Sequence, residues 1–446
     1  MNKRIKFLIS AVLIFALFVS SFILPASSYE TGVETSTADM LLVNLDTDTV
    51  VFSQKPDNMW YAGYLSELVT FLVAYELIDK PEEVTYQVEK DFSSSLPHKD
   101  GCLNPYIDKE LTAKDLMAIM LLTSGNDAAY ALADLASDGD RETFVTAMND
   151  KVKALGCKNT GFVSPGYDST SDQYTTCRDL YTIYMALREN PLFNEIMSAR
   201  PLRYIPESLV SDDQEQNEAY TVTPEASILN ESSPYYFRYT NDAKYSHTDA
   251  TYANMALTTT YRGKTYFFAG LLGLNESERN IYADAKKLAT WAYLNLSDYK
   301  MINSDESVTQ IKVTTDWGEY NVGLHPSNSA FKTLPNEYDE KKVAYQFNIP
   351  ESVKVPIAEG QSVGGAKISY DGNEIGEVQL NVTSDEGISM LPDMGRFSTY
   401  VLKQLTPREP STEATEAQEE KSGETKAPGT IEKAQSNASS SKTMED

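Results

Sequence analysis

The chain has 446 residues and a net charge of −27, with 65 acidic and 38 basic side chains. Proteins bind nucleic acids with Lys and Arg side chains that neutralise phosphates, so we expect no nucleic-acid partner for so acidic a chain. The length predicts two or three domains, and a hydrophobic content of 41% is enough for ordinary cores.

The first 28 residues have the pattern of a secretory signal peptide. Three basic side chains among the first six residues precede an apolar run over 7–24, and Ala26 and Ser28 place small residues where a cleavage site needs them. We therefore expect residues 1–28 to direct export and to be removed. An uncleaved anchor helix is the alternative.

The cysteines and histidines form no metal-binding pattern, because no CxxC pair is present and the histidines are widely spaced. We expect no metal and no cofactor. The sequence contains three cysteines, Cys102, Cys157 and Cys177. Two arrangements stay open: one disulfide with a free thiol, or three buried thiols.

Strands come first along the chain and helices follow. Alternating apolar residues predict a hairpin over 40–54, and apolar residues at helical spacing predict a helix over 65–77. Further helices are expected to about residue 190. Thr112 with Asp115 is typical of a capping pair at one helix start.

From about residue 235 the pattern returns to strands. Two apolar stretches, 255–257 and 266–272, lie on either side of a turn at Arg262-Gly263, and a helix over 285–292 closes the region. Strands, helices, strands and a last helix predict an α+β domain whose sheet joins distant segments.

The remaining chain divides into three further parts. Residues 308–381 alternate like strands and contain a hairpin signal at Asp371-Gly372, which predicts a small all-β domain. An amphipathic helix is expected over 386–405, and it could touch a membrane surface through residues 388–405 or dock on its own domain. The composition of 406–446 predicts a disordered acidic tail rich in Ser and Thr.

Ser124-Gly125-Asn126 and its flanks resemble the second active-site motif of the D-alanyl-D-alanine carboxypeptidases, the low-molecular-mass penicillin-binding proteins of peptidase family S11. The stretches 144–162 and 174–180 follow in the order of that family, and 356–360 with the turn at 371–372 resembles its C-terminal β-domain. The resemblance covers nearly the whole mature chain to about residue 405.

This resemblance implies a fold and an activity. It implies a domain like the serine β-lactamases over 29–300, with an antiparallel sheet, helices and a helical subdomain, and a β-sandwich-like domain over 301–385. It also implies serine-type carboxypeptidase chemistry on the stem peptides of peptidoglycan, in the cell envelope of a bacterium.

The catalytic pair of that family is absent at the expected position. The nucleophilic serine of the family opens S-x-x-K at the start of a helix, and the lysine helps to remove its proton. The register places Tyr64 at the serine and Glu67 at the lysine. A shift by one residue would bring Gly63 to the serine position, and Ser66 points elsewhere on a helix. Three other S-x-x-K strings lie outside the expected position: Ser297–Lys300, Ser329–Lys332 and Ser439–Lys442.

The third motif of the family, K-T-G, is also altered. The register gives Lys244, Tyr245 and Ser246, whereas a second candidate over 264–266 comes one strand too late. In the family the lysine and threonine hold the substrate carboxylate, and the adjacent backbone completes the oxyanion hole.

The charges of Glu67 and Lys244 sum to about zero, which weakens the attraction for a terminal carboxylate. We expect the two side chains to pair directly or through Ser124.

Three functions stay open: a catalytically inactive exported relative that binds wall peptide or a cell-wall protein, a working carboxypeptidase, and a surface scaffold. In plainer interpretations Ser124 and Asn126 only support a helix, and Lys244 is an ordinary solvated lysine.

Overall fold

The structure is a computed structural model that describes residues 29–97, 101–167, 172–198, 203–247, 252–274, 280–315, 318–354, 357, 360–382 and 432–433. These residues form two compact units, one from 29–46 and 50–295, the other from 47–49 and Leu296 onward. The expected signal peptide and amphipathic helix lie outside the described residues, and of the expected tail only Glu432–Lys433 is described, as strand β18 beside β10 (Leu296–Ile302).

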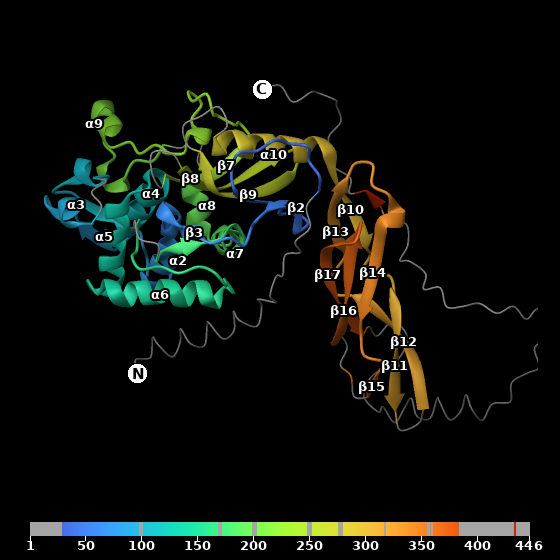
Figure 1. The fold of residues 1–446 in the computed structure, drawn as a ribbon. Coiled ribbons are helices and arrows are strands. Elements are labelled where there is room, and N and C mark those ends of the chain that lie inside the picture. The colour runs from blue at the N-terminus through green and yellow to red at the C-terminus, as the bar shows by residue number, and fades with distance from the viewer. Residues whose placement is uncertain are drawn as a thin grey trace, which may run out of the picture. The chain divides into compact units, whose positions relative to one another are not determined.

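An antiparallel five-stranded sheet in the order β2-β1-β9-β8-β7 forms the middle of the first unit (Figure 1). Its first hairpin pairs through β1 with β9, so the sheet joins distant segments as predicted. The strands are β1 (Asp39–Asn44), β2 (Thr49–Gln54), β7 (Thr240–His247), β8 (Tyr252–Tyr261) and β9 (Lys264–Leu274).

The helices predicted over 65–77 and 285–292 are present, over Glu67–Leu77 and Ile281–Asn295. The capping box is confirmed, because the Asp115 amide donates to Thr112 Oγ1 at 3.0 Å and the Thr112 amide donates to Asp115 Oδ2 at 2.9 Å. The helices are α2 (Glu67–Leu77), α3 (Phe92–Ser95), α4 (Ala113–Thr123), α5 (Asn126–Ser137), α6 (Arg141–Ala154), α7 (Cys177–Arg188), α8 (Pro191–Ser198), α9 (Gln214–Ala219) and α10 (Ile281–Asn295).

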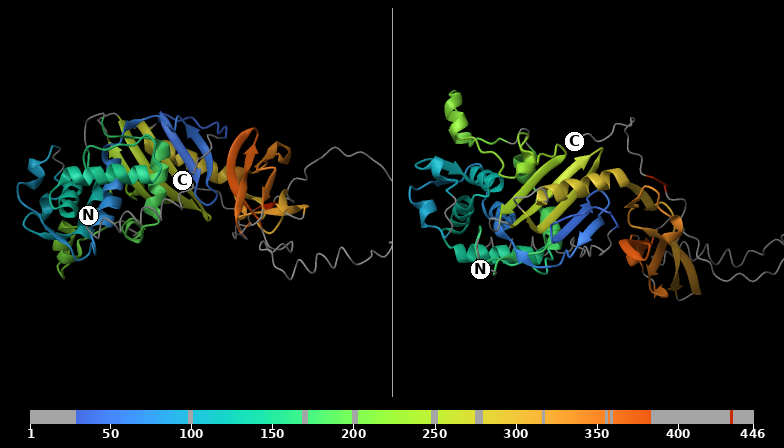
Figure 2. Two further views of the ribbon diagram at one scale, coloured as in Figure 1. Left: turned by 90° about the horizontal axis from the view of Figure 1, so that it is seen from below. Right: turned by 45° about the horizontal axis from the view of Figure 1, so that its top comes forward.

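Helices cover both faces of the sheet. Tyr266 of β9 contacts Tyr293 of α10, and the next residue, Phe267, packs against Tyr184 of α7. Successive residues of a strand point to opposite faces, so α10 and α7 lie on opposite sides. Figure 2 shows α10 along one face of the sheet. Two short ribbons complete the unit: β3 (Trp60–Tyr61) with β6 (Tyr174–Thr175), and β4 (Thr85–Gln87) with β5 (Glu110–Thr112).

The second unit is all-β in its described part, as predicted, apart from one short 3-10 turn. Its larger sheet has the order β14-β16-β17-β12-β11-β15, and β13 pairs with β10. Both residues of the predicted hairpin turn, Asp371 and Gly372, have positive φ values of 51° and 80°, as a tight two-residue turn requires. The remaining strands are β11 (Thr309–Thr315), β12 (Gly318–Pro326), β13 (Ala330–Pro335), β14 (Val343–Asn348), β15 (Ser352–Lys354), β16 (Ser362–Tyr370) and β17 (Asn373–Val382).

The unit begins earlier than expected. Strand β10 follows α10 directly, so the second unit starts at Leu296 and not at 301. Buried and half-buried residues do not alternate regularly along this strand. Its sequence therefore lacks the period of two that reveals a strand.

The three cysteines are free thiols. Burial raises the pKa of Cys177 well above its ordinary value, and burial with the nearby charge of Asp179 raises that of Cys157. Within the described ranges no group of three or more His, Cys, Asp or Glu side chains is arranged to hold a metal ion. No helix in those ranges is both long and apolar enough to span a membrane.

Candidate functional site

Tyr64 lies in a 3-10 turn, Gly63–Ser66, that leads directly into α2. Gly63 has φ +55°, a conformation that glycine adopts without steric cost. The Tyr64 side chain is only 6% exposed, and its ring stacks on Tyr167 with centroids 4.8 Å apart and contacts the His247 ring at 5.3 Å. The aromatic side chain is therefore packed on two sides by rings from other parts of the chain.

Ser124 lies at the junction between α4 and α5. It has a left-handed backbone, φ 54° and ψ 46°, which costs about 1–2 kcal/mol for a residue with a Cβ. Its hydroxyl donates to the carbonyl of Tyr245 on β7 at 3.1 Å. Buried Asn126 accepts from the Tyr167 amide through Oδ1 at 2.9 Å. The junction therefore connects the helices to β7 and to the segment that carries Tyr167.

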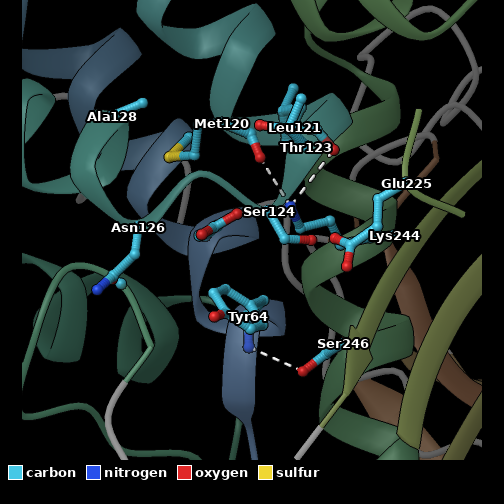
Figure 3. A network of polar contacts seen from close by, with 12 residues as sticks. Tyr64, Met120, Leu121, Thr123, Ser124, Asn126, Ala128, Glu225, Lys244 and Ser246 are labelled. Atoms are coloured by element: carbon cyan, nitrogen blue, oxygen red, sulfur yellow. Dashed lines mark hydrogen bonds and ion pairs between the residues drawn. The ribbon is translucent and has the colours of Figure 1, made fainter. Parts of the chain in front are cut away.

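Lys244 and Glu67 form a buried ion pair, with 2% and 0% of their side chains exposed. Lys244 Nζ donates to Glu67 Oε2 at 2.5 Å. It also donates to the carbonyls of Met120 and Leu121 at 2.8 and 3.3 Å (Figure 3). Those carbonyls belong to the last turn of α4, where the helix dipole favours a cation. An ammonium group has three N–H donors, so all three are used within the protein. The pair forms directly and not through Ser124, and Lys244 is not a solvated lysine.

Ser246 contacts the backbone of Tyr64. The Tyr64 amide donates to Ser246 Oγ at 2.9 Å, and the serine is fully buried (Figure 3). The neighbouring Tyr245 stacks on Tyr282 of α10, with centroids 5.2 Å apart, and its ring centroid lies 6.5 Å from that of His247. The structure therefore brings the seven predicted site residues together: Tyr64, Glu67, Ser124, Asn126, Lys244, Tyr245 and Ser246.

Two residues of the same neighbourhood were not predicted, Glu225 and His247. Glu225 Oε1 lies 3.5 Å from His247 Nδ1. Burial acts to raise the pKa of Glu225, but hydrogen bonds with His247 and Ser124 and the charge of Lys244 outweigh it, and the pKa is lowered. Glu225 lies in a loop with no periodic pattern, so nothing in the sequence signals it. His247 directly follows Ser246, and extending the strand register by one residue would have included it.

The alternative motifs lie elsewhere. Ser297–Lys300 falls within β10, and Ser329–Lys332 runs into β13, so neither string opens a helix as the family motif requires. Ser439–Lys442 lies outside the described residues. The second K-T-G candidate opens β9, which is separated from β7 by β8. Ser66 donates to the carbonyls of Gly63 and Gly166, both at 2.9 Å, and so stabilises the turn.

Asp242, two residues before Lys244 on β7, should make stability depend on pH. Burial raises its pKa to about 7, although hydrogen bonds from Thr258 lower it in part; Tyr184 also donates to this carboxylate. The folded state therefore keeps a proton at pH values where the unfolded chain, with the ordinary aspartate pKa of 3.8, has already lost it. Stability from this group is greatest below about pH 4 and falls as the pH rises to about 7, by roughly 3 kcal/mol between pH 5 and pH 8.

Asp242→Asn should remove that fall, because an amide does not ionise. Urea unfolding at pH 5 and pH 8 measures the effect for both proteins. A decline of the same size in the variant would show that other groups cause it.

Comparisons with known proteins agree with this architecture. A family profile described as D-alanyl-D-alanine carboxypeptidase matches residues 26–260, and one described as the C-terminal domain of penicillin-binding protein 5 matches residues 297–387. The chain is 24% identical over 398 residues to the D-alanyl-D-alanine carboxypeptidase DacA of Haemophilus influenzae, which covers 86% of this chain and 94% of that protein. It is 23% identical over 357 residues to the carboxypeptidase DacF of Bacillus subtilis, covering 77% and 84%.

Solved structures show the same fold. Penicillin binding protein 5 from Haemophilus influenzae aligns with a TM-score of 0.61 at 20% identity, over 79% of this chain and 97% of that one. A peptidoglycan synthesis regulatory factor, PBP3 of Streptococcus pneumoniae, aligns with a TM-score of 0.57 at 14% identity, over 79% and 99%. At such identities the likeness establishes the arrangement of the chain, and the chemistry of the site must be argued from its own residues.

Proposed function

The chain belongs to the D-alanyl-D-alanine carboxypeptidase family, and from that premise we propose that it has lost the acyl-transfer reaction and binds wall peptide in the former active site. It is a carboxypeptidase-like penicillin-binding protein of peptidoglycan metabolism. The inactivity and the binding role are the proposed parts. A cell-wall protein that presents a similar peptide is the alternative ligand.

The observation that carries the proposal is the environment of Lys244. Its ammonium group is buried and already donates to one carboxylate and two main-chain carbonyls. No donor is left for the terminal carboxylate of a substrate. The cation that would attract that carboxylate is also neutralised by Glu67 at 2.5 Å.

The nucleophile position supports the same conclusion. A phenol ionises near pH 10, so Tyr64 would need a base or a positive charge beside it to attack a carbonyl at neutral pH. The side chain one helical turn away is Glu67, whose contacting oxygen accepts from Lys244. A carboxylate disfavours ionisation of a nearby phenol, so this neighbour is of the wrong sign.

The oxyanion site independently supports the proposed loss of the reaction. Serine-type acyl transfer needs backbone N–H groups aimed at the oxygen that becomes charged in the transition state. By family register the Tyr64 amide is one such group, and here it donates to Ser246 Oγ at 2.9 Å. The loss of one such donor typically slows the reaction by about 10²–10³-fold. Ser124 and Asn126, in this proposal, keep the shape of the site through their bonds to β7 and to Tyr167.

The domain arrangement is part of the proposal. Residues 1–28 act as the export signal, 29–295 form the carboxypeptidase-like domain, and the stretch from Leu296 to about 385 forms the β-domain. The helix over 386–405 gives peripheral membrane contact, and 406–446 form the tail. The protein then acts outside the cytoplasm, in the cell envelope, where peptidoglycan lies.

Incubation with a synthetic stem pentapeptide that ends in D-Ala-D-Ala tests both parts of the proposal. We expect no release of D-alanine even at equal concentrations of protein and peptide, whereas saturation-transfer NMR should detect the bound peptide. Tyr245→Ala should weaken binding because it removes a ring from the site, and Tyr338→Ala in the second unit is the matched control. Release of D-alanine would refute the inactivity, and absence of binding would favour the surface scaffold.

A further inference from the structure

Glu225 adds a carboxylate to the site that the family motifs do not include. Its backbone amide donates to the Leu122 carbonyl at 2.8 Å, which fixes the loop against the end of α4. The side chain is 33% exposed, and its carboxylate lies 3.5 Å from His247 Nδ1. The carboxylate also accepts from Ser124, and both residues are seen in Figure 3. The single hydroxyl proton of Ser124 thus has two acceptors, the Glu225 carboxylate and the Tyr245 carbonyl.

The charges of the site now favour a cation. Glu67 and Lys244 cancel one another, because they are buried and in direct contact. Glu225 then supplies the one further full charge, and its lowered pKa keeps it ionised at neutral pH. Glu67, Lys244 and Glu225 together carry a net charge of about −1, opposite to what a ligand carboxylate needs.

The His247 ring, which lies beside this carboxylate, belongs to a cluster of aromatic rings. The His247 ring lies 5.3 Å from Tyr64 and 6.5 Å from Tyr245, and Tyr245 stacks on Tyr282 at 5.2 Å. Ring faces attract cations, and the attraction grows when the cation is partly removed from water. A carboxylate at the edge of an aromatic cluster is the chemistry that binds an alkylammonium group.

We propose that the site recognises a primary amine of a peptide, with Glu225 as the charged partner and the rings of Tyr64, Tyr245 and His247 around it. This inference rests on the proposed function, because it names the ligand group that an inactive site would bind. Glu225 and the rings recognise the amine, whereas the carboxylate end of the peptide makes no charged contact.

A set of three peptides tests the inference with the full mature chain. The first is Nα-acetyl-Lys-D-Ala-D-Ala with a free ε-amine, the second has that amine acetylated, and the third keeps the amine but carries a C-terminal amide. We expect the first and third to bind equally in isothermal titration calorimetry, and the second to bind at least tenfold more weakly.

Variants assign the effect to one carboxylate. Glu225→Gln keeps the size of the side chain and should weaken binding of the amine peptides at least tenfold, whereas Glu231→Gln, at an exposed position outside the site, should leave it unchanged. Circular dichroism checks that both variants are folded. Binding that depends on the C-terminal carboxylate, binding indifferent to acetylation, or no binding by any peptide would each overturn the inference. None of these outcomes bears on the lost reaction, which D-alanine release measures separately.

Discussion

The double variant Tyr64→Ser/Glu67→Lys is expected to stay unlabelled by a fluorescent penicillin, although it restores the serine and lysine of the family motif. The quadruple variant that also carries Tyr245→Thr and Ser246→Gly is expected to react. The difference should be at least about 100-fold in the rate of acylation, the typical effect of one oxyanion-hole donor.

The reason lies in the contact between β7 and the turn before α2. Ser246 Oγ accepts the Tyr64 amide at 2.9 Å, and changing the side chain of residue 64 leaves that backbone contact in place. Replacing Ser246 by glycine removes the acceptor and frees the amide for the carbonyl oxygen of the penicillin. Tyr245→Thr supplies the hydroxyl that the family uses beside Lys244.

Tyr245→Thr/Ser246→Gly without the other two changes is the control for this series, and it should stay unlabelled because it has no nucleophile. Gel fluorescence after a time course gives the rates. Labelling of the double variant as fast as the quadruple variant would show that Ser246 does not block the site.

Lys244→Met should destabilise the first unit by about 3–5 kcal/mol, the usual cost of removing one partner of a buried ion pair. The substitution keeps an unbranched side chain of similar length. It leaves the Glu67 carboxylate buried without the cation, and it removes the donor from the Met120 and Leu121 carbonyls.

A second substitution distinguishes the cost of leaving one charge unpaired from the cost of losing the ion pair as a whole. Glu67→Met combined with Lys244→Met should recover most of the loss, because a buried pair replaced by apolar side chains of similar volume is often close to neutral. Lys80→Met is the matched control: Lys80 is 58% exposed and pairs with Glu83, so its loss should cost less than about 1 kcal/mol.

Urea denaturation followed by far-UV circular dichroism measures these differences, since the α-helices of the described chain all belong to the first unit. A loss below about 1 kcal/mol for Lys244→Met would mean that the ion pair is not buried as described. A double variant as unstable as the single one would place the cost in the lost carbonyl contacts and not in the charge.

Much of the fold was predictable because it depends on local patterns. The first hairpin, the helix before residue 77 and the Thr112–Asp115 capping box follow from periodicity and from capping chemistry. The hairpin turn at 371–372 follows from its Asp-Gly pair. Strand β10 was missed because it lacks regular alternation and follows a helix without a loop.

The site was predictable only in part. Motif order indicated which residues would meet, including the pair of Glu67 with Lys244. Motif order could not indicate that main-chain carbonyls of α4 also accept from Lys244, because a contact with a carbonyl does not depend on which side chain the residue carries. The contribution of Glu225 depends on where an irregular loop passes over the end of α4, and only the tertiary structure places that loop.

The most direct test of the proposed loss of acyl transfer is the labelling of the unaltered chain with a fluorescent penicillin, beside an active carboxypeptidase of the family as the positive control. We expect no covalent adduct, even after long incubation with excess penicillin. The reasons are that all three N–H donors of Lys244 are used within the protein, that Tyr64 stands in place of a serine, and that the Tyr64 amide already donates to Ser246. Stoichiometric labelling, with intact-protein mass spectrometry showing one bound penicillin, would contradict the account.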